Sequence, residues 1–215
     1  MQLSLTFWVV LLLCSSACRN SSGREGSYIP RDGSDSLRLL HSYNVEDIAT
    51  PVNEHIPLKR LMDSLGIDSS DLSIAVDKSD CLLSVLNDTV IIKQYPDVFG
   101  RNPTDDKTYE GDCCTPEGNF KVIAKYEHAM WSRFIWFDYP NEVSLQRHRE
   151  AKRIGLVPDD RGPGGQVGIH GVPQGYDYLI QYRINWTAGC NSLKNKDVED
   201  LYSCVYKGMV IKIVK

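Results

Sequence analysis

The sequence predicts a mostly β domain with a few short helices, and two kinds of pattern carry this prediction. Apolar residues alternate with polar ones at Leu72, Ile74 and Val76, which is the period of a half-buried strand. Asn87 and Asp88 separate two further apolar runs, as the turn of a β-hairpin does. Helical spacing is confined to short stretches, so helices contribute little to the expected fold.

The remaining elements follow in chain order. A first helix is indicated by the spacing of Leu58, Leu61, Met62 and Leu65, and Gly66 supplies its stop. The hairpin strands contain Leu83 and Val85 on one side of the turn and residues 90–92 on the other. Further strands are expected over residues 121–125, 134–137, 166–170 and 209–214, and a second helix over Val198, Leu201, Tyr202 and Val205. In the strand 166–170, Val167 and Ile169 share one face, so His170 points away from the apolar layer.

The N-terminal segment predicts secretion. Residues 7–13 form an apolar run that is too short to span a bilayer, which needs about 20 residues. Small residues follow this run up to Cys18, so we expect a cleaved signal peptide over residues 1–17. Ordinary signal peptidase and the lipoprotein-processing enzyme would cut the same bond, and lipidation of Cys18 distinguishes them. We expect Cys18 to be lipidated and to anchor a lipoprotein that faces the periplasm.

Composition divides the rest of the chain. Residues 18–55 are rich in Ser, Gly, Asp and Arg, as expected of a flexible tether. A short helical lead-in follows over residues 56–71, and residues 72–215 form the predicted main domain. The net charge of −4 lacks the basic character of nucleic-acid-binding proteins, so we expect no nucleic-acid partner.

Cys190 and His170 are the candidate catalytic residues. His170 precedes Gly171, and Cys190 closes the block Thr187-Ala188-Gly189-Cys190. A cysteine becomes a useful nucleophile when an imidazole takes its proton or lowers its pKa. Glycine beside it lets a substrate carbonyl approach the backbone donors. The pattern indicates acyl transfer by a thiol.

Other segments accompany these blocks in a fixed order. They are Val76-Asp77-Lys78-Ser79, Gly111-Asp112, Thr115-Pro116-Glu117-Gly118-Asn119-Phe120, Asp138-Tyr139-Pro140-Asn141 and Gly164-Gly165. Together with the His and Cys blocks they extend from Leu72 to Lys215. This arrangement resembles the L,D-transpeptidase catalytic domain, and the resemblance implies that family's β-sandwich or barrel-like fold with a few short helices.

The chain departs from the family pattern around the cysteine. Many members have a second His where this chain has Ala188. A common version continues after the Cys with an apolar residue and then Arg or Asn, whereas this chain continues with Asn191-Ser192-Leu193. Cys190 and His170 therefore carry over from the resemblance, but the substrate contacts of that Arg or Asn do not.

The resemblance implies an enzyme that joins peptidoglycan stem peptides in 3→3 cross-links through a thioester on Cys190, without a metal or an organic cofactor. His170 would act as the base, held in its tautomer by the carbonyl of Gly171. Backbone amides around Gly189 and Cys190 would bind the oxyanion.

Several neighbouring residues are candidates for supporting roles. Four residues are expected to orient the site or to bind the oxyanion that forms during acyl transfer. They are Gly171, Thr187, Ala188 and Gly189. Thr187 is equally well explained as a turn former. Ser192 and Tyr176 are candidate substrate contacts, although ordinary loop packing also explains a tyrosine such as Tyr176. The aromatic residues clustered over residues 126–139 are better explained as part of the core and of a hairpin edge than as a surface on which sugar rings stack.

Other functions fit the same residues. With water as the acceptor the site would be an L,D-carboxypeptidase. The altered residues around Cys190 also fit a non-catalytic lipoprotein that binds the cell wall, and a thiol peptidase for ordinary L-peptides is a third interpretation. The other cysteines, Cys81, Cys113, Cys114 and Cys204, could pair with one another, but spacing assigns no bridges. Adjacent cysteines near His128 lack the spacing of a zinc site, so no metal is assigned.

Overall fold

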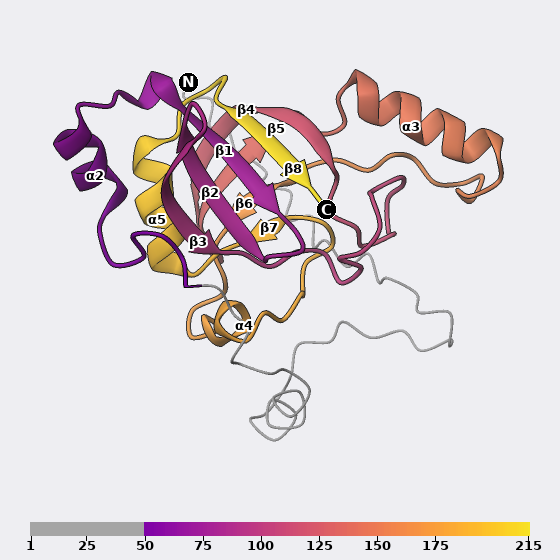
Figure 1. Cartoon of the computed structure of the whole chain (residues 1–215). Helices are drawn as coiled ribbons and strands as arrows, with labels where there is room; N and C mark the ends of the chain where they lie inside the picture. The colour runs from indigo at the N-terminus through magenta and orange to yellow at the C-terminus, as the bar shows by residue number, and fades with distance from the viewer. Residues whose placement is uncertain (1–49) are drawn as a thin grey trace, which may run out of the picture.

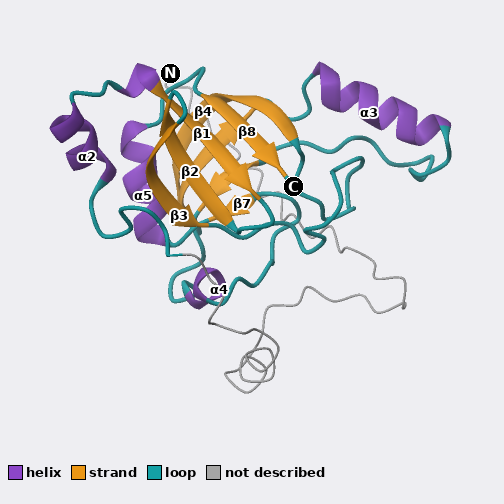
Figure 2. Ribbon diagram, in the orientation of Figure 1, coloured by secondary structure: helices purple, strands orange, loops and turns teal. Residues whose placement is uncertain are grey.

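A computed structural model describes residues 50–215 of the chain. The predicted signal peptide, the lipidation of Cys18 and most of the predicted tether lie outside the described residues. Within the described part, eight strands form a sheet in the order β3-β2-β1-β8-β4-β5-β6-β7, with short helices around it (Figures 1 and 2). The mostly β prediction is therefore confirmed. No helix of residues 50–215 has the length and apolar character that a membrane span needs.

The bounds of the elements agree with most of the sequence predictions. The strands are β1 Leu72–Asp77, β2 Leu82–Asn87, β3 Val90–Pro96, β4 Gly118–His128, β5 Ser132–Phe137, β6 Gly168–His170, β7 Asn191–Ser192 and β8 Val210–Val214. The helices are α2 Leu58–Leu65, α3 Glu142–Arg153, α4 Tyr178–Gln181 and α5 Asn195–Cys204, with a 3-10 turn at Ser69–Asp71. Helices α3 and α4 and the two-residue strand β7 were not predicted.

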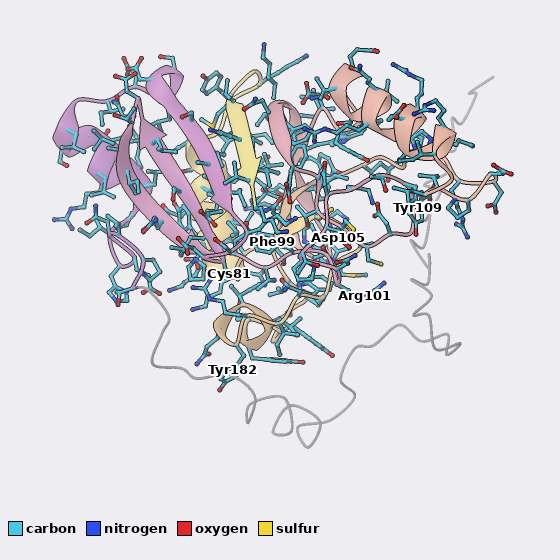
Figure 3. All side chains as sticks on the ribbon, turned by 45° about the vertical axis from the view of Figure 1, so that its right-hand side comes forward. Cys81, Phe99, Arg101, Asp105, Tyr109 and Tyr182 are labelled. Atoms are coloured by element: carbon cyan, nitrogen blue, oxygen red, sulfur yellow. The ribbon has the colours of Figure 1, made fainter. Side chains whose placement is uncertain are left out.

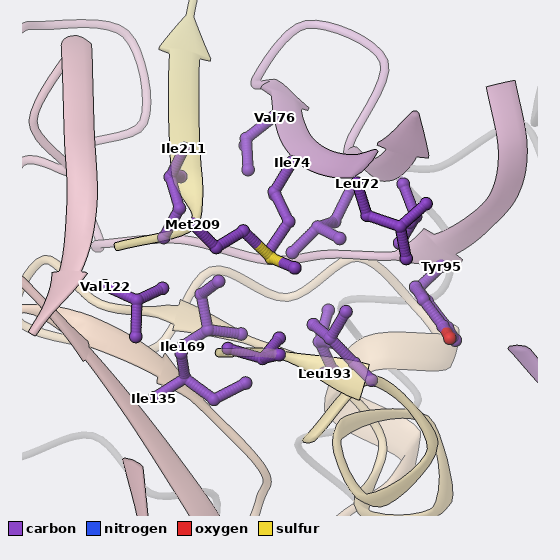
Figure 4. Packing of buried hydrophobic residues seen from close by; sticks show 14 of the residues in the cluster. Leu72, Ile74, Val76, Tyr95, Val122, Ile135, Ile169, Leu193, Met209 and Ile211 are labelled. Atoms are coloured by element: carbon purple, nitrogen blue, oxygen red, sulfur yellow. The ribbon is translucent and has the colours of Figure 1, made fainter. Parts of the chain in front are cut away.

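Strand β4 turns the sheet into two layers because it belongs to both halves. Residues 118–121 pair with β8, and residues 122–128 pair with β5. The register shifts between Val122 and Ala124, and such an irregularity bends a strand and increases its twist. Figure 4 shows the result, in which Ile74 on β1 faces Ile135 and Ile169 across a buried apolar layer.

A segment after β3 joins the far edges of this folded sheet. Val98 and Ser192 exchange two backbone hydrogen bonds, with N···O distances of 3.1 and 2.8 Å. Thr187 N donates to Phe99 O, and Arg101 N donates to Thr187 O, both at 3.1 Å. Figure 3 shows Phe99 and Arg101 at this end of the sheet. Residues 97–102 therefore hold the loop that precedes β7.

The helices occupy different positions around the sheet. Helix α5 packs on β5, and α2 lies beside α5, where the Leu58 amide donates to both carboxylate oxygens of Asp200 at 2.9 and 3.1 Å. Helix α3 extends away from the sheet (Figure 1). Its sequence lacks an apolar stripe, which explains why periodicity missed it, but Asn141 caps it by accepting from Ser144 N at 3.1 Å.

The predicted tether over residues 18–55 extends too far at its C-terminal end. The buried Lys93 ammonium on β3 donates to the carbonyls of Asn53, Glu54 and Ile56 at 2.9, 3.0 and 2.6 Å. Gln94 N also donates to Val52 O at 2.9 Å. Residues 52–56 are thus part of the folded domain, because a buried lysine needs these acceptors to offset its lost hydration.

Candidate active site

The imidazole of His170 is oriented by a main-chain carbonyl. Strand β6 ends at His170. The Nδ1 atom of His170 lies 2.6 Å from Gly171 O. Because a carbonyl only accepts, Nδ1 must carry the proton, which leaves the lone pair of Nε2 for a second partner. Ser192 Oγ donates to the same carbonyl at 3.3 Å. The Gly171 carbonyl therefore has the position that the resemblance implies.

Aromatic side chains surround the imidazole. The ring of His170 stacks on Trp131, with centroids 4.4 Å apart, and on Phe134, with centroids 5.8 Å apart. Trp186 meets it edge-on at 5.6 Å. Trp131 also holds Gly171, the residue after His170, because the Trp131 carbonyl accepts from Gly171 N at 3.0 Å. The imidazole does point away from Ile169 and the main core, as predicted, but it enters a second apolar environment.

This environment determines the charge of His170. The side chain is 2% exposed, and burial lowers the pKa of the imidazole from 6.5 to about 4. The hydrogen bond to Gly171 opposes this shift, and the neighbouring His128 adds to it. At neutral pH His170 is therefore an uncharged base.

The residues before Cys190 form a tight turn organised by Thr187. Thr187 Oγ1 donates to Cys190 O at 2.7 Å and accepts from Gly189 N at 3.1 Å. The hydroxyl is buried and fully used within the loop, which supports the turn-forming interpretation over a substrate contact. The Gly189 amide, one of the expected oxyanion donors, donates to Thr187 Oγ1 in this structure, and its role toward an oxyanion stays a prediction.

Gly189 is required by backbone geometry. Its φ is +139°, and a Cβ at this position would lie 2.6 Å from Cys114 O, closer than real contacts permit. The loop therefore lies directly against residues 113–114. Ala188, the position of the second His in many relatives, is exposed.

Strand pairing brings Cys190 to the histidine strand. Strands β6 and β7 are parallel, with Ile169 opposite Asn191 and His170 opposite Ser192. Leu193 N donates to His170 O at 2.9 Å, which extends this pairing beyond β7. Cys190 directly precedes β7 and is partly buried, and its thiol donates to Gln166 O at 3.8 Å.

Tyr126 is a neighbour of this site that sequence reasoning did not assign. Its pKa is raised, first by burial and second by the negative charge of Cys190. Tyr126 stacks on Phe134 with centroids 5.3 Å apart, and Phe134 stacks on His170. Residues 126–134 thus supply an aromatic wall as well as a hairpin, and the hairpin's register, which sequence spacing does not reveal, brings that wall to the histidine.

The two candidate substrate contacts have different placements. Ser192 is fully buried, and its hydroxyl is used by Gly171 O, so the structure places it behind the site rather than on its surface. Tyr176 is half-buried and packs with Trp186 on a small cluster that contains Val98 and Ile180. Tyr176 therefore lies on the same side as the tryptophan that meets His170.

The remaining cysteines do not form the four-cysteine pairing that their count allowed. Cys113 is disulfide-bonded, whereas Cys81, Cys114 and Cys204 are thiols. Burial raises the pKa of all three thiols, that of Cys114 to about 12, so they are poor nucleophiles at neutral pH. Among residues 50–215, no three His, Cys, Asp or Glu side chains are grouped as a metal site would require.

Comparison with known proteins identifies the family. The model of the L,D-transpeptidase catalytic domain (YkuD) matches residues 71–213. The chain belongs to the L,D-transpeptidase catalytic domain family. Among curated protein sequences, none matches it.

Three solved structures are similar to part of this chain. The helical cell shape determining protein Pgp2 from Campylobacter jejuni is 22% identical, with a TM-score of 0.49 over 75% of this chain and 56% of that chain. A point mutant of the same protein is 21% identical, with a TM-score of 0.50 over 77% and 57%. L,D-transpeptidase 3 from Mycobacterium tuberculosis is 14% identical, with a TM-score of 0.45 over 67% and 61%. This L,D-transpeptidase-family chain spans little more than half the length of the Campylobacter protein.

Proposed function

We propose that this chain is an L,D-transpeptidase that forms 3→3 cross-links between peptidoglycan stem peptides through a thioester on Cys190. The observation that carries the proposal is the bond from His170 Nδ1 to Gly171 O, which leaves Nε2 of an uncharged imidazole available as a base. Family membership supports the reaction class, and the parallel pairing of β6 with β7, which sets Ser192 opposite His170, supports the pairing of this base with Cys190.

The reaction has two half-steps. The Cys190 thiol loses its proton to His170 Nε2, and the sulfur attacks the carbonyl carbon on the L-centre side of the donor's terminal D-residue. The C–N bond to that residue breaks, and His170 returns the proton to the leaving amine. An amine of a second stem then attacks the thioester, the new amide forms, and the thiol regains its proton.

The oxyanion needs donors close to the sulfur. Because Thr187 uses the Gly189 amide, the proposal assigns this role to the Cys190 amide, which moves with the nucleophile. The bonds from Thr187 to Cys190 O and Gly189 N support this assignment by fixing the peptide planes on both sides. The expectation of no metal and no organic cofactor is part of the proposal.

The test is intact mass spectrometry of the purified chain with a stem tetrapeptide, run in parallel on Cys190→Ala and with an added acceptor amine. We expect a thioester adduct that has lost the terminal D-residue, absent from Cys190→Ala, and a cross-linked product when the acceptor is present. Release of tripeptide without cross-linking would instead establish an L,D-carboxypeptidase at the same site. A bound stem with no adduct would favour a non-catalytic wall-binding protein.

We also propose that the protein is a periplasm-facing lipoprotein acylated at Cys18. The support is the apolar run at residues 7–13 followed by small residues, since such a segment directs secretion and Cys18 stands at the processing position. Metabolic labelling with an alkyne fatty acid, compared between the natural chain and Cys18→Ala, tests this. Label on both variants, or on neither, would contradict lipidation at Cys18.

A further inference from the structure

A buried carboxylate lies directly behind the nucleophile, at the start of the segment 97–102. Asp97 is 0% exposed, and so are Asn191 and Ser192, the two residues that follow Cys190. Asp97 Oδ2 accepts from Asn191 Nδ2 at 2.7 Å, and Asp97 Oδ1 accepts from Ser192 N at 3.1 Å. Burying a carboxylate is costly, so its partners are expected to matter.

The same two residues connect Asp97 to the base. Ser192 lies opposite His170 in the β6–β7 pair, and its hydroxyl donates to Gly171 O, the acceptor of His170 Nδ1. One carboxylate therefore restrains the strand that carries the nucleophile, and through Ser192 it restrains the carbonyl that orients the base.

A buried cation accompanies Asp97. Arg183 lies nearby, and its positive charge favours the ionised carboxylate, while its guanidinium donates to the Cys81 carbonyl. Asp97 N donates to that same carbonyl at 2.9 Å. The main chain of Asp97 and the side chain of Arg183 are thus held at one point of the chain, the Cys81 carbonyl.

Asn191 and Asp97 are chemically matched as donor and acceptor. Asn191 stands where a common family version has an apolar residue, which could not donate to Asp97. An asparagine amide offers a donor and an acceptor, so it can partner a carboxylate or a carboxylic acid. The structure pairs this unusual asparagine with a buried acid that the proposed reaction does not consume.

We propose that Asp97 is a positioning residue for Cys190: through Asn191 and Ser192 it fixes strand β7 and thereby the relative placement of the thiol and the imidazole. This proposal rests on the proposed function only where catalytic activity is measured. Asp97 touches neither the substrate nor the reacting atoms, so its effect is on the alignment of Cys190 with His170.

The first experiment measures nucleophile reactivity without any substrate. The purified chain is alkylated with iodoacetamide over pH 5 to 9, and modification of the Cys190 peptide is followed by mass spectrometry, separately from the other thiols. The variant Asp97→Asn keeps one acceptor oxygen. Its amide N–H group then faces either Asn191 Nδ2 or Ser192 N, and both of these atoms are donors. We expect the Cys190 rate to fall on the order of tenfold or more, because small misplacements of reacting groups are costly.

A reciprocal double variant separates positioning from simple loss of folding. When Asp97→Asn is combined with Asn191→Asp, the amide introduced on the segment 97–102 can donate to the carboxylate introduced on β7. The oxygen of that same amide accepts from Ser192 N, so both contacts are restored with donor and acceptor exchanged. We expect the double variant to recover most of the alkylation rate.

A serine pair supplies the matched control. Ser192→Ala removes the hydroxyl that donates to Gly171 O and should slow alkylation of Cys190. Ser203→Ala is its control, since Ser203 Oγ also donates to a main-chain carbonyl, Asp200 O at 2.7 Å, but on helix α5 rather than on β7. We expect Ser203→Ala to leave the Cys190 rate unchanged.

The outcomes separate the two proposals. Support for the positioning role is a slowed Cys190 in Asp97→Asn and Ser192→Ala, recovery in the double variant, and no change in Ser203→Ala. Unchanged Cys190 alkylation in folded Asp97→Asn overturns it, and so does loss of rate that only parallels loss of thermal stability without recovery in the double variant. If the natural chain forms no adduct with the stem tetrapeptide while these alkylation effects persist, the proposed reaction fails and the positioning role stands.

Discussion

At the scale of the residue, the state of His170 decides how the site works. An imidazole buried among Trp131, Phe134 and Trp186, with only a carbonyl for a partner, favours the uncharged form. A solvent-exposed histidine would be half protonated near pH 6.5. The base is thus ready to accept a proton throughout the neutral range.

We therefore predict that His170 titrates with a pKa of about 4, well below that of an ordinary histidine. Nuclear magnetic resonance of ¹⁵N-labelled histidine side chains, assigned with His170→Gln, measures this directly. Its Nδ1 resonance should remain protonated and its Nε2 unprotonated from pH 5 to 8. A midpoint at or above 6.5 would show that the ring is more hydrated than the aromatic contacts indicate.

Gly189 gives a second prediction at this scale. In Gly189→Ala the new methyl group would lie 2.6 Å from Cys114 O on a backbone with φ of +139°, so the turn before Cys190 must shift. We expect acyl transfer to fall by roughly tenfold to a hundredfold, with a smaller effect on stem binding. Gly162→Ala is the control, since nothing lies within 4 Å of its added carbon. Equal activity of both variants in a stopped-time assay would contradict the prediction.

Cys190, His170 and the orienting role of Gly171 could be proposed from sequence because short blocks carry them. The surrounding aromatics could not, since Trp131 reaches His170 only through the antiparallel register of β5 with β6. The contact of Asp97 with β7 could not be predicted from the sequence either. Its only signal is a single acid next to an apolar run, and its partner Asn191 is distant in the sequence and becomes adjacent when β7 joins residues 97–102.

At the scale of the element, two features show what sequence patterns capture. Alternation and helical spacing found most of the strands and the two helices α2 and α5, which bury an apolar face, but missed the four-residue helix α4. Helix α3 buries only Ser144, His148 and Ala151, so the apolar pattern was absent. Its terminal signals were nonetheless present: Asn141 at the cap, acidic Glu142 in the first turn and basic residues in the last.

Lys93 provides a prediction for the element that precedes the sheet. Its ammonium donates to three carbonyls of residues 53–56 and lies 3.6 Å from Asp200. Lys93→Met leaves those acceptors without a donor, so we expect a loss on the order of 2 kcal/mol in unfolding free energy and faster proteolysis within residues 50–57. Denaturant-induced unfolding measures the loss of stability, and timed digestion with a protease measures the rate of cleavage.

The matched control for Lys93 is Lys59→Met on α2. Lys59 pairs with Asp63 at 2.6 Å, but both side chains are mostly exposed, so this variant should change stability very little. Similar losses for the two lysine variants would contradict the anchoring role of Lys93.

At the scale of the whole molecule, buried ionisable groups set the pH range of stability. Burial raises the pKa of Asp97 from 3.8 to about 8, although the hydrogen bonds from Asn191 and Ser192 and the charge of Arg183 oppose this shift. Burial also raises the pKa of Asp197 to about 6. Both groups bind protons more tightly in the folded chain, so stability falls as the pH rises from about 4 through these values. His170 has the opposite sign: its contribution is present above pH 6.5 and is lost as the pH falls toward 4.

The measurement is the melting temperature of the natural chain, Asp97→Asn and His170→Gln from pH 4 to 9. We expect Asp97→Asn to reduce the decline between pH 5 and 8, and His170→Gln to reduce the decline below pH 6.5. Parallel curves for all three proteins would show that these two side chains are not the groups responsible.

The order of strands has a consequence for biosynthesis. Strand β8, residues 210–214, lies between β1 and β4, pairing with β1 in parallel and with β4 in antiparallel fashion. Both neighbours leave the ribosome long before β8 does, so each waits with an open edge until the final strand of the sheet has been synthesised. The two halves of the sheet therefore cannot be joined through β8 before residues 210–214 have left the ribosome.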